Sequence, residues 1–156
     1  FRSSIEINLF TQNILNSKEK FVSFDRHEEE PIIVFKDNEM SIYEAIILDI
    51  HKYENLGYES IAVICKTQQE TLIVQKKLTN LANIRLYNIE DTEIIKGTLV
   101  LPSYISKGLE FDVVLVFNVS KDNYKSEFDR NLLYVACTRA LHRLVIYYTG
   151  EKCEFL

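Results

Sequence analysis

The chain has 156 residues, 47% of them hydrophobic and 26% charged, which suffices for the core of one globular domain and excludes wholesale disorder. Its net charge of −5 argues against a protein that binds a polyanion over its whole surface. No apolar run approaches the roughly 18 residues needed to cross a bilayer, so we expect no membrane partner and a cytoplasmic setting.

In chain order, four helix starts are predicted from a hydroxyl side chain placed three residues before an acid. This is the spacing of a capping box, in which the two side chains satisfy each other's free backbone N–H groups. The pairs are Ser3 with Glu6, Ser41 with Glu44, Thr67 with Glu70, and Ser126 with Asp129. After the second and third starts, apolar residues recur every three or four positions, as in one-sided helices. These residues are Ile42, Ala45, Ile46, Ile50 and Tyr53, and then Val74, Leu78 and Leu81.

Short runs rich in branched residues lie between these helices and predict six strands. Several runs are apolar at nearly every position, as expected of parallel strands that are covered on both faces. The runs are 32–35, 61–65, 84–87, 98–101, 113–117 and 144–148. The alternation of strand and helix therefore favours a three-layer α/β domain with a mostly parallel sheet.

The cysteines and histidines give no sign of a disulfide framework or a metal site. Cys65, Cys137 and Cys153 are odd in number and widely spaced, and two of them lie in apolar runs, which favours buried, reduced thiols. The three histidines stand at no ligand spacing from one another or from a cysteine. We therefore expect no bound metal ion.

Glycine occurs at only four positions, and this scarcity excludes several nucleotide-binding motifs. Neither a phosphate loop of the form G-x-x-x-x-G-K-[ST] nor a dinucleotide fingerprint G-x-G-x-x-G is present. The G-x-S-x-G elbow of one large class of hydrolases is also missing. If the chain handles a nucleotide, it does not cradle the phosphates alone.

Three strings in the chain carry a family resemblance. "SKGLEFDVVLV" and "LLYVACTRALHRLVIYY" resemble the fifth and sixth helicase motifs of the UvrD/Rep group of superfamily 1 helicases, and the opening "FRSS" resembles the fourth. In that family these motifs belong to the second RecA-like domain, a P-loop NTPase-like α/β domain that closes over ATP held by the first. The resemblance implies that residues 1–156 form a single C-terminal RecA-like domain, a piece of a longer ATP-dependent helicase or translocase.

The resemblance assigns roles at an ATP site. Arg139 and Arg2 match family arginines that reach the γ-phosphate, where a guanidinium neutralises charge on the transferred phosphoryl group. Glu110 matches a glutamate that contacts the ribose, and Gly108, beside Lys107, would let the backbone approach the nucleotide. Magnesium would come mainly from the N-terminal domain.

Simpler explanations for the same residues stay open. Arg139 could be a cation in the last turn of a helix, where it interacts favourably with the helix dipole. Arg2 could belong to a frayed, solvated terminus. The stretch 107–110 could be a tight turn that leads into a buried strand.

Two groups of residues are candidates for contact with nucleic acid. Where the family usually has a threonine and a histidine ahead of Lys107, this chain has Pro102 and Tyr104. The family histidine touches single-stranded DNA, so Tyr104 could stack on a base, or it could pack beside the preceding strand. Lys66 and Thr67 lie near the place where family members touch the DNA backbone, although Thr67 also has the role of a helix cap.

Within the family, the variant strings look most like the HelD branch, whose members associate with bacterial RNA polymerase and use ATP to remodel or release it. The family's inserted subdomain is expected to be absent, or reduced to a loop of about fifteen residues after Ser17. A translocase or remodelling ATPase is then as plausible as a processive helicase. The implied partners are the N-terminal RecA-like domain of the same protein, single-stranded DNA and RNA polymerase.

Two alternatives to the enzyme hypothesis remain open at this point. A non-catalytic α/β module could retain the motif residues for packing and dock to a protein such as RNA polymerase, with binding indifferent to ATP. A single-stranded nucleic-acid binder without ATP would instead show an affinity that falls with salt. The enzyme hypothesis itself predicts that the isolated chain is inactive.

Overall fold

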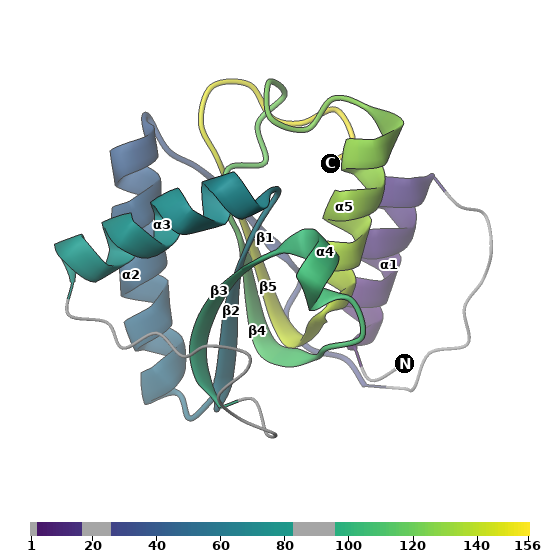
Figure 1. Cartoon of the computed structure of the whole chain (residues 1–156). Coiled ribbons are helices and arrows are strands. Elements are labelled where there is room, and N and C mark those ends of the chain that lie inside the picture. The colour runs from purple at the N-terminus through teal and green to yellow at the C-terminus, as the bar shows by residue number, and fades with distance from the viewer. Residues whose placement is uncertain (1–2, 17–25, 83–95) are drawn as a thin grey trace.

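The computed structural model describes residues 3–16, 26–82 and 96–156, which form five helices and five strands within these ranges. In chain order these are α1 (Ile5–Leu15), β1 (Ile32–Phe35), α2 (Glu39–Asn55), β2 (Ser60–Cys65), α3 (Gln68–Leu81), β3 (Gly97–Pro102), α4 (Ser103–Ser106), β4 (Phe111–Val116), α5 (Glu127–Thr138) and β5 (Ala140–Tyr148). Figure 1 shows three layers, with α2 and α3 on one side of the sheet and α1, α4 and α5 on the other.

The strands form one sheet in the order β1-β5-β4-β2-β3, and every pair in it is parallel. The middle of the sheet is fully covered, since every residue of β2 is buried. Coverage on both faces explains why the strands are apolar at successive positions and not at alternate ones. The predicted three-layer α/β fold with a parallel sheet is confirmed.

Each face of the sheet carries its own hydrophobic core. Successive residues of a strand point to opposite faces, so Ile64 packs in the core beneath α1 and α5 while Val63 packs in the core beneath α2 and α3. Ile7 and Leu133 complete the first core from the helices, and Ile46 lies in the second. Each such side chain stabilises the fold by roughly 1.5–3 kcal/mol through burial alone.

Five of the six predicted strands are found, β1 with the predicted bounds and the other four with shifted ends. β4 begins two residues earlier than expected and β5 four residues earlier, because Asp112, His142 and Arg143 interrupt the apolar runs while their backbones still pair. The short helix α4 was not predicted, and Leu81, assigned to the buried face of α3, is exposed. The sixth predicted strand, 84–87, lies outside the described residues.

The predicted helix starts are correct for α3 and α5. Ser126 and Asp129 form the full capping box at the start of α5, each side chain accepting a hydrogen bond from the other's backbone N–H. Thr67 is the N-cap of α3, but the Glu70 carboxylate accepts from the backbone N–H of Lys66, one residue ahead of the cap. The hydroxyl-acid spacing therefore located both helices.

The other two predicted caps were wrong by one and three residues. Ser4, and not Ser3, caps α1, because the Ser3 hydroxyl donates to the carbonyl of Ala140 at 2.6 Å. Asn38 caps α2 by accepting from the backbone N–H of Ser41, so Ser41 lies inside the first turn. In both cases another residue with a suitable side chain competed for the same role.

All three cysteines are unpaired and buried. Burial raises the pKa of the Cys65 and Cys137 thiols well above the ordinary value, which keeps them neutral and unreactive. Among the described helices, none is both long and apolar enough to traverse a lipid bilayer.

The two-sided core predicts a large effect of truncation at Ile64. Ile64→Ala should lower the free energy of unfolding by about 2–5 kcal/mol, because it removes buried methyl groups and leaves a cavity beneath α5. Leu72→Ala on the exposed side of α3 should change it by less than about 0.5 kcal/mol. Urea denaturation followed by circular dichroism measures both, and equal effects would contradict the assignment of the core.

The capping box of α5 predicts a pH-dependent contribution from Asp129. Burial raises the pKa of this carboxyl, but hydrogen bonds from the backbone N–H groups of Lys125 and Ser126 and the ammonium of Lys66 outweigh burial, so the pKa is lowered overall. The ionised form therefore stabilises the folded state above the ordinary value of 3.8, and this stabilisation is lost as the pH falls through the lower, folded value.

We expect Asp129→Asn to reduce the free energy of unfolding at neutral pH, and the deficit relative to the unchanged protein to shrink as the pH falls below about 4. Denaturant titrations over that range measure the deficit. Glu127→Gln, an exposed neighbour on the same helix, is the control and should show a small deficit at every pH. A deficit for Asp129→Asn that does not vary with pH would refute the assignment.

Candidate functional site

The turn at 107–110 enters β4 from α4 and lies mostly at the surface. Gly108 has φ +86°, a conformation that side chains disfavour, and a Cβ built there would meet no atom within 4 Å. Glycine is therefore required by the backbone angle and not by crowding. Lys107 and Glu110 are exposed on either side, while Leu109 packs against the core.

Arg139 follows the last residue of α5 and is held against this turn. Its Nη1 donates to the carbonyl of Leu109 at 3.3 Å, and its Nε donates to the carbonyl of Val135 at 3.2 Å. Nη2 donates to the hydroxyl of Thr138 at 3.2 Å. The backbone carbonyl of Arg139 in turn accepts from the N–H of Phe111 at 2.9 Å, where β4 begins. The sheet therefore brings the sequence-predicted Arg139 and turn 107–110 together.

The Arg139 guanidinium is half-buried and retains unused donors. A guanidinium carries five N–H groups, and three of them are engaged in the contacts above, so two remain without a partner among the described residues. Burial lowers the pKa of Arg139, while the neighbouring Glu110 and Tyr134 counteract that effect. An arginine stays charged under such a shift, so the site offers a fixed positive fork near the surface.

The start of α1 lies beside the same edge of the sheet. Ser3 binds the carbonyl of Ala140, and the backbone N–H of Ser4 donates to the carbonyl of Leu141 at 3.3 Å. Arg2, the second predicted γ-phosphate ligand, lies outside the described residues. The described part of this edge thus contains the start of α1, the turn 107–110 and Arg139.

Tyr104 lies on α4, which directly follows the carboxyl end of β3. Tyr104 is 58% exposed, so more than half of it is open to solvent and not packed beside the strand that ends at Pro102. The helix below it is fixed, since the Ser103 hydroxyl donates to the carbonyl of Leu132 at 2.5 Å and that of Ser106 donates to Ser103. The ring is presented to solvent from a rigid base.

Lys66 and Thr67 lie at the carboxyl end of β2, where both take part in internal contacts. The Lys66 ammonium donates to the carbonyl of Asn123 at 2.5 Å and lies 3.2 Å from the Asp129 carboxylate. Thr67 caps α3 through its hydroxyl. These contacts connect β2, the 118–126 loop and α5, which gives both residues a structural role.

The sequence analysis missed Asn123 of this network and did not predict the contacts of Glu70 with Lys66 and Asn123. Glu70 accepts from the backbone N–H of Lys66 and from the side-chain amide of Asn123 at 3.1 Å. Burial raises the pKa of Glu70 above its ordinary value, although these hydrogen bonds counteract the effect. The capping spacing had drawn attention to Glu70, but nothing local could indicate Asn123, which is more than fifty residues away.

The predicted residues therefore divide between the two opposite ends of the parallel strands, which are called the opposite edges of the sheet here. Arg139, Gly108 and Glu110 lie where β4 and β5 begin, whereas Lys66, Thr67 and Tyr104 lie near the ends of β2 and β3. A strand of six residues separates the edges by roughly 20 Å. In the described ranges, no group of three or more histidine, cysteine or acidic side chains is placed to hold a metal ion.

Comparisons with known proteins bear on the fold and on part of the sequence. Residues 98–147, which include most of β3, the turn 107–110 and Arg139, match the UvrD-like helicase C-terminal domain model. A crystal structure of the C-terminal domain of a possible DNA helicase from Lactobacillus plantarum WCFS1 superimposes with a TM-score of 0.82 and 28% identity, over 99% of this chain and 91% of that one.

A second structure, an arterivirus nonstructural protein 10 helicase with DNA, aligns with a TM-score of 0.48 and 14% identity, over 94% of this chain and 32% of that one, which is too weak to support an inference. No curated protein sequence matches the chain. The chain thus has the fold of a helicase C-terminal RecA-like domain, and its segment 98–147 is similar to the UvrD-like helicase C-terminal domain family.

Proposed function

We propose that this domain completes an ATP site whose phosphate loop lies in an N-terminal RecA-like domain, within an ATP-dependent helicase or translocase. The observation that carries the proposal is the half-buried Arg139 guanidinium, fixed against the carbonyl of Leu109 with two donors to spare. The domain has no phosphate loop of its own. It would therefore contribute ligands to a nucleotide held elsewhere.

Arg139 and the turn 107–110 offer groups that suit the parts of a nucleoside triphosphate. Two guanidinium N–H groups in one plane suit the oxygens of a phosphate, which accept paired hydrogen bonds. The exposed carboxylate of Glu110 can accept hydrogen bonds from ribose hydroxyls. Open space at Gly108 would let a ligand approach the backbone. Lys107 adds an exposed positive charge at the same turn.

The chemical role of Arg139 would be electrostatic. Charge spreads over the oxygens of the transferred phosphoryl group in the transition state, and a guanidinium aimed at them lowers the barrier. Such a contact is worth more in a site that excludes water, because the effective dielectric constant falls. Contact would require the two domains to close, so hydrolysis would be coupled to domain movement.

The opposite edge of the sheet would serve nucleic acid. Tyr104 offers an exposed aromatic ring for stacking on a base. The side chains of Lys66 and Thr67 already bind within the domain. These residues are therefore candidates only for contacts at the border of a path that the nucleic-acid backbone would follow. If ATP and nucleic acid bind at separate edges, closure of the two domains over ATP would move the edge that contacts nucleic acid.

The finer assignments remain predictions. The HelD-like strings suggest RNA polymerase as a partner, and a remodelling ATPase would fit the reduced insertion expected after Ser17, most of which lies outside the described residues. The cytoplasmic setting and single-stranded DNA as a substrate are also still predictions. The alternative protein-binding module would show partner binding that does not respond to ATP.

The ATP hypothesis predicts a loss of turnover on changing Arg139. In the full-length protein, Arg139→Ala should lower the rate of ATP hydrolysis by about 10³-fold or more, because the transition state loses its neutralising charge. Arg139→Lys should also be slow, since an ammonium cannot reproduce the planar fork. Phosphate release under saturating ATP measures both rates.

Arg130→Ala is the matched control, since this arginine lies on the same helix and contacts Glu127 and Phe155 away from the turn. It should leave turnover unchanged. A near-normal rate of ATP hydrolysis by a folded Arg139→Ala protein would contradict the proposed function.

Tyr104 provides a separate prediction for nucleic acid. Tyr104→Ala should weaken the affinity of the full-length protein for single-stranded DNA by about 1–3 kcal/mol, since the mutation removes a stacking surface. Tyr104→Phe keeps the ring and should bind as well as the unchanged protein. Fluorescence anisotropy at constant salt measures the affinities. Equal affinity of all three proteins would exclude stacking at this position.

A further inference from the structure

The two outer strands of the sheet are covered very differently. From Thr98 onward β3 is buried, and Gln75 of α3 donates to the carbonyl of Val100 at 3.1 Å. In β1, by contrast, Ile32, Ile33 and Phe35 are 39%, 36% and 51% exposed. An apolar edge strand left open in this way is a template for pairing with another chain.

The hydrogen-bonding groups on the open side of β1 can be identified. The backbone N–H of Lys36 donates to the carbonyl of Tyr148 at 2.9 Å, and Phe35 is opposite Tyr148 in the parallel register. In a parallel pair, alternate residues direct their N–H and C=O toward the partner strand. The N–H and C=O groups of Ile33 and Phe35 therefore point away from β5, and no described strand pairs with them.

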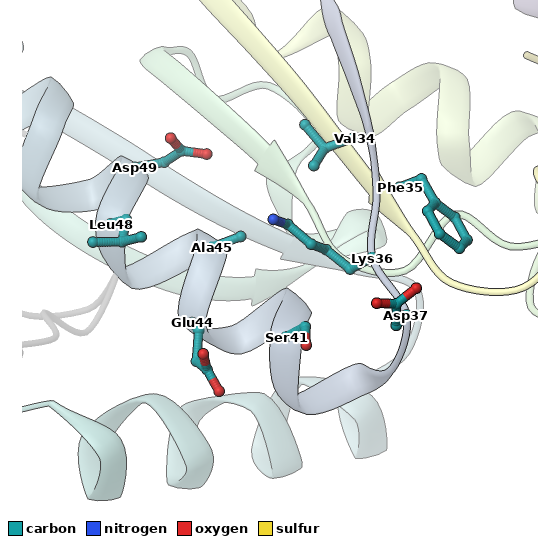
Figure 2. Close-up of a pocket in the computed structure, with 9 residues that line it drawn as sticks. All are labelled: Val34, Phe35, Lys36, Asp37, Ser41, Glu44, Ala45, Leu48 and Asp49. Carbon is teal, nitrogen blue, oxygen red and sulfur yellow. The ribbon is translucent and has the colours of Figure 1, made fainter.

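A groove lies beside this edge, between β1 and α2. It has a volume of about 520 Å³, within the range of binding clefts. Figure 2 shows the Lys36 side chain extending from the end of β1 toward Ala45 of α2. Val34, Phe35 and the well-exposed Leu48 supply apolar surface along the groove.

The charge of the groove is mainly negative. Three carboxylates, those of Asp37, Glu44 and Asp49, line it together with one ammonium, that of Lys36. Asp49 accepts a hydrogen bond from the Tyr147 hydroxyl at 2.5 Å, whereas Asp37 and Glu44 form no ion pair with any described residue. These two exposed carboxylates are therefore available to a positively charged ligand.

We propose that the β1 edge and the adjoining groove bind an extended segment of a partner protein in which apolar and basic side chains alternate. The segment would add a sixth strand through the outward N–H and C=O groups of Ile33 and Phe35. Alternate side chains of this strand would point to opposite faces of the sheet. The basic set would face α2 and reach Asp37 and Glu44, and the apolar set would lie on the opposite face beside the exposed Ile33 and Phe35.

Charge disfavours a second copy of this chain as the occupant. Antiparallel pairing of two β1 strands would bring together two grooves that each carry the same excess of carboxylates, on chains with a net charge of −5. Like charges at such a contact weaken association. The surface is also independent of Arg139 and the turn 107–110, so it can be tested separately from ATP hydrolysis.

The test uses a blocked eight-residue peptide of alternating valine and lysine, with a valine-glutamate peptide for comparison, titrated by isothermal calorimetry. The lysine peptide should bind at least about tenfold more tightly, because only its charge complements Asp37 and Glu44. Ile33→Pro should weaken its binding by about tenfold or more, since proline removes an outward N–H that β5 does not use. Ile33→Val keeps that N–H and should bind normally.

Glu44→Lys provides a second variant that leaves the strand unchanged, since Glu44 is exposed on α2. It should reduce or reverse the preference for the lysine peptide. Failure of the lysine peptide to bind, equal binding of the two peptides, or binding that is indifferent to both Ile33→Pro and Glu44→Lys would overturn the proposal. Self-association of the chain through the same edge, detected by light scattering and abolished by Ile33→Pro, would overturn it in favour of a second copy.

Discussion

The parallel pairing of β4 and β5 is the constraint on which the candidate site depends. Because the strands are parallel neighbours, the turn that enters β4 and the end of α5 that enters β5 must meet at one edge of the sheet. The hydrogen bond from Phe111 N–H to the carbonyl of Arg139 fixes that meeting point, and the guanidinium then reaches Leu109. Residues thirty positions apart become one surface through sheet register alone.

The same topology places the candidate residues at the two opposite ends of the strands and leaves β1 as an open outer strand. Ligands of open α/β sheets usually bind at the carboxyl ends of the strands, where a phosphate loop would lie. This chain has no such loop, and its arginine and glutamate lie at the amino ends of β4 and β5 instead. Under the proposed function, that position would suit a domain that contacts a nucleotide bound by a neighbouring domain. The carboxyl ends of β2 and β3 would then be open to another ligand.

Much of the fold could be predicted from the sequence, because its main determinants are local. Apolar strands such as β2 and the capping box at Ser126 are set by neighbouring residues. Competition between adjacent polar residues misled the prediction at Ser3, whose hydroxyl binds Ala140 from across the chain. For the candidate site, the strings around Glu110 and Arg139 drew attention to these residues, and their roles stay predictions. The contact of Arg139 with Leu109 and the contacts of Asn123 join distant parts of the chain, so periodicity cannot reveal them.

The contacts of the half-buried Arg139 explain how its guanidinium is held in one place without a ligand. Removing a guanidinium from water is costly unless its donors are satisfied, and three contacts with Leu109, Val135 and Thr138 offset that cost. Those contacts also restrict the long side chain to one orientation before any ligand arrives. A phosphate that binds there would then meet a charge that is already partly desolvated and oriented, so little reorganisation would be needed at the moment of reaction.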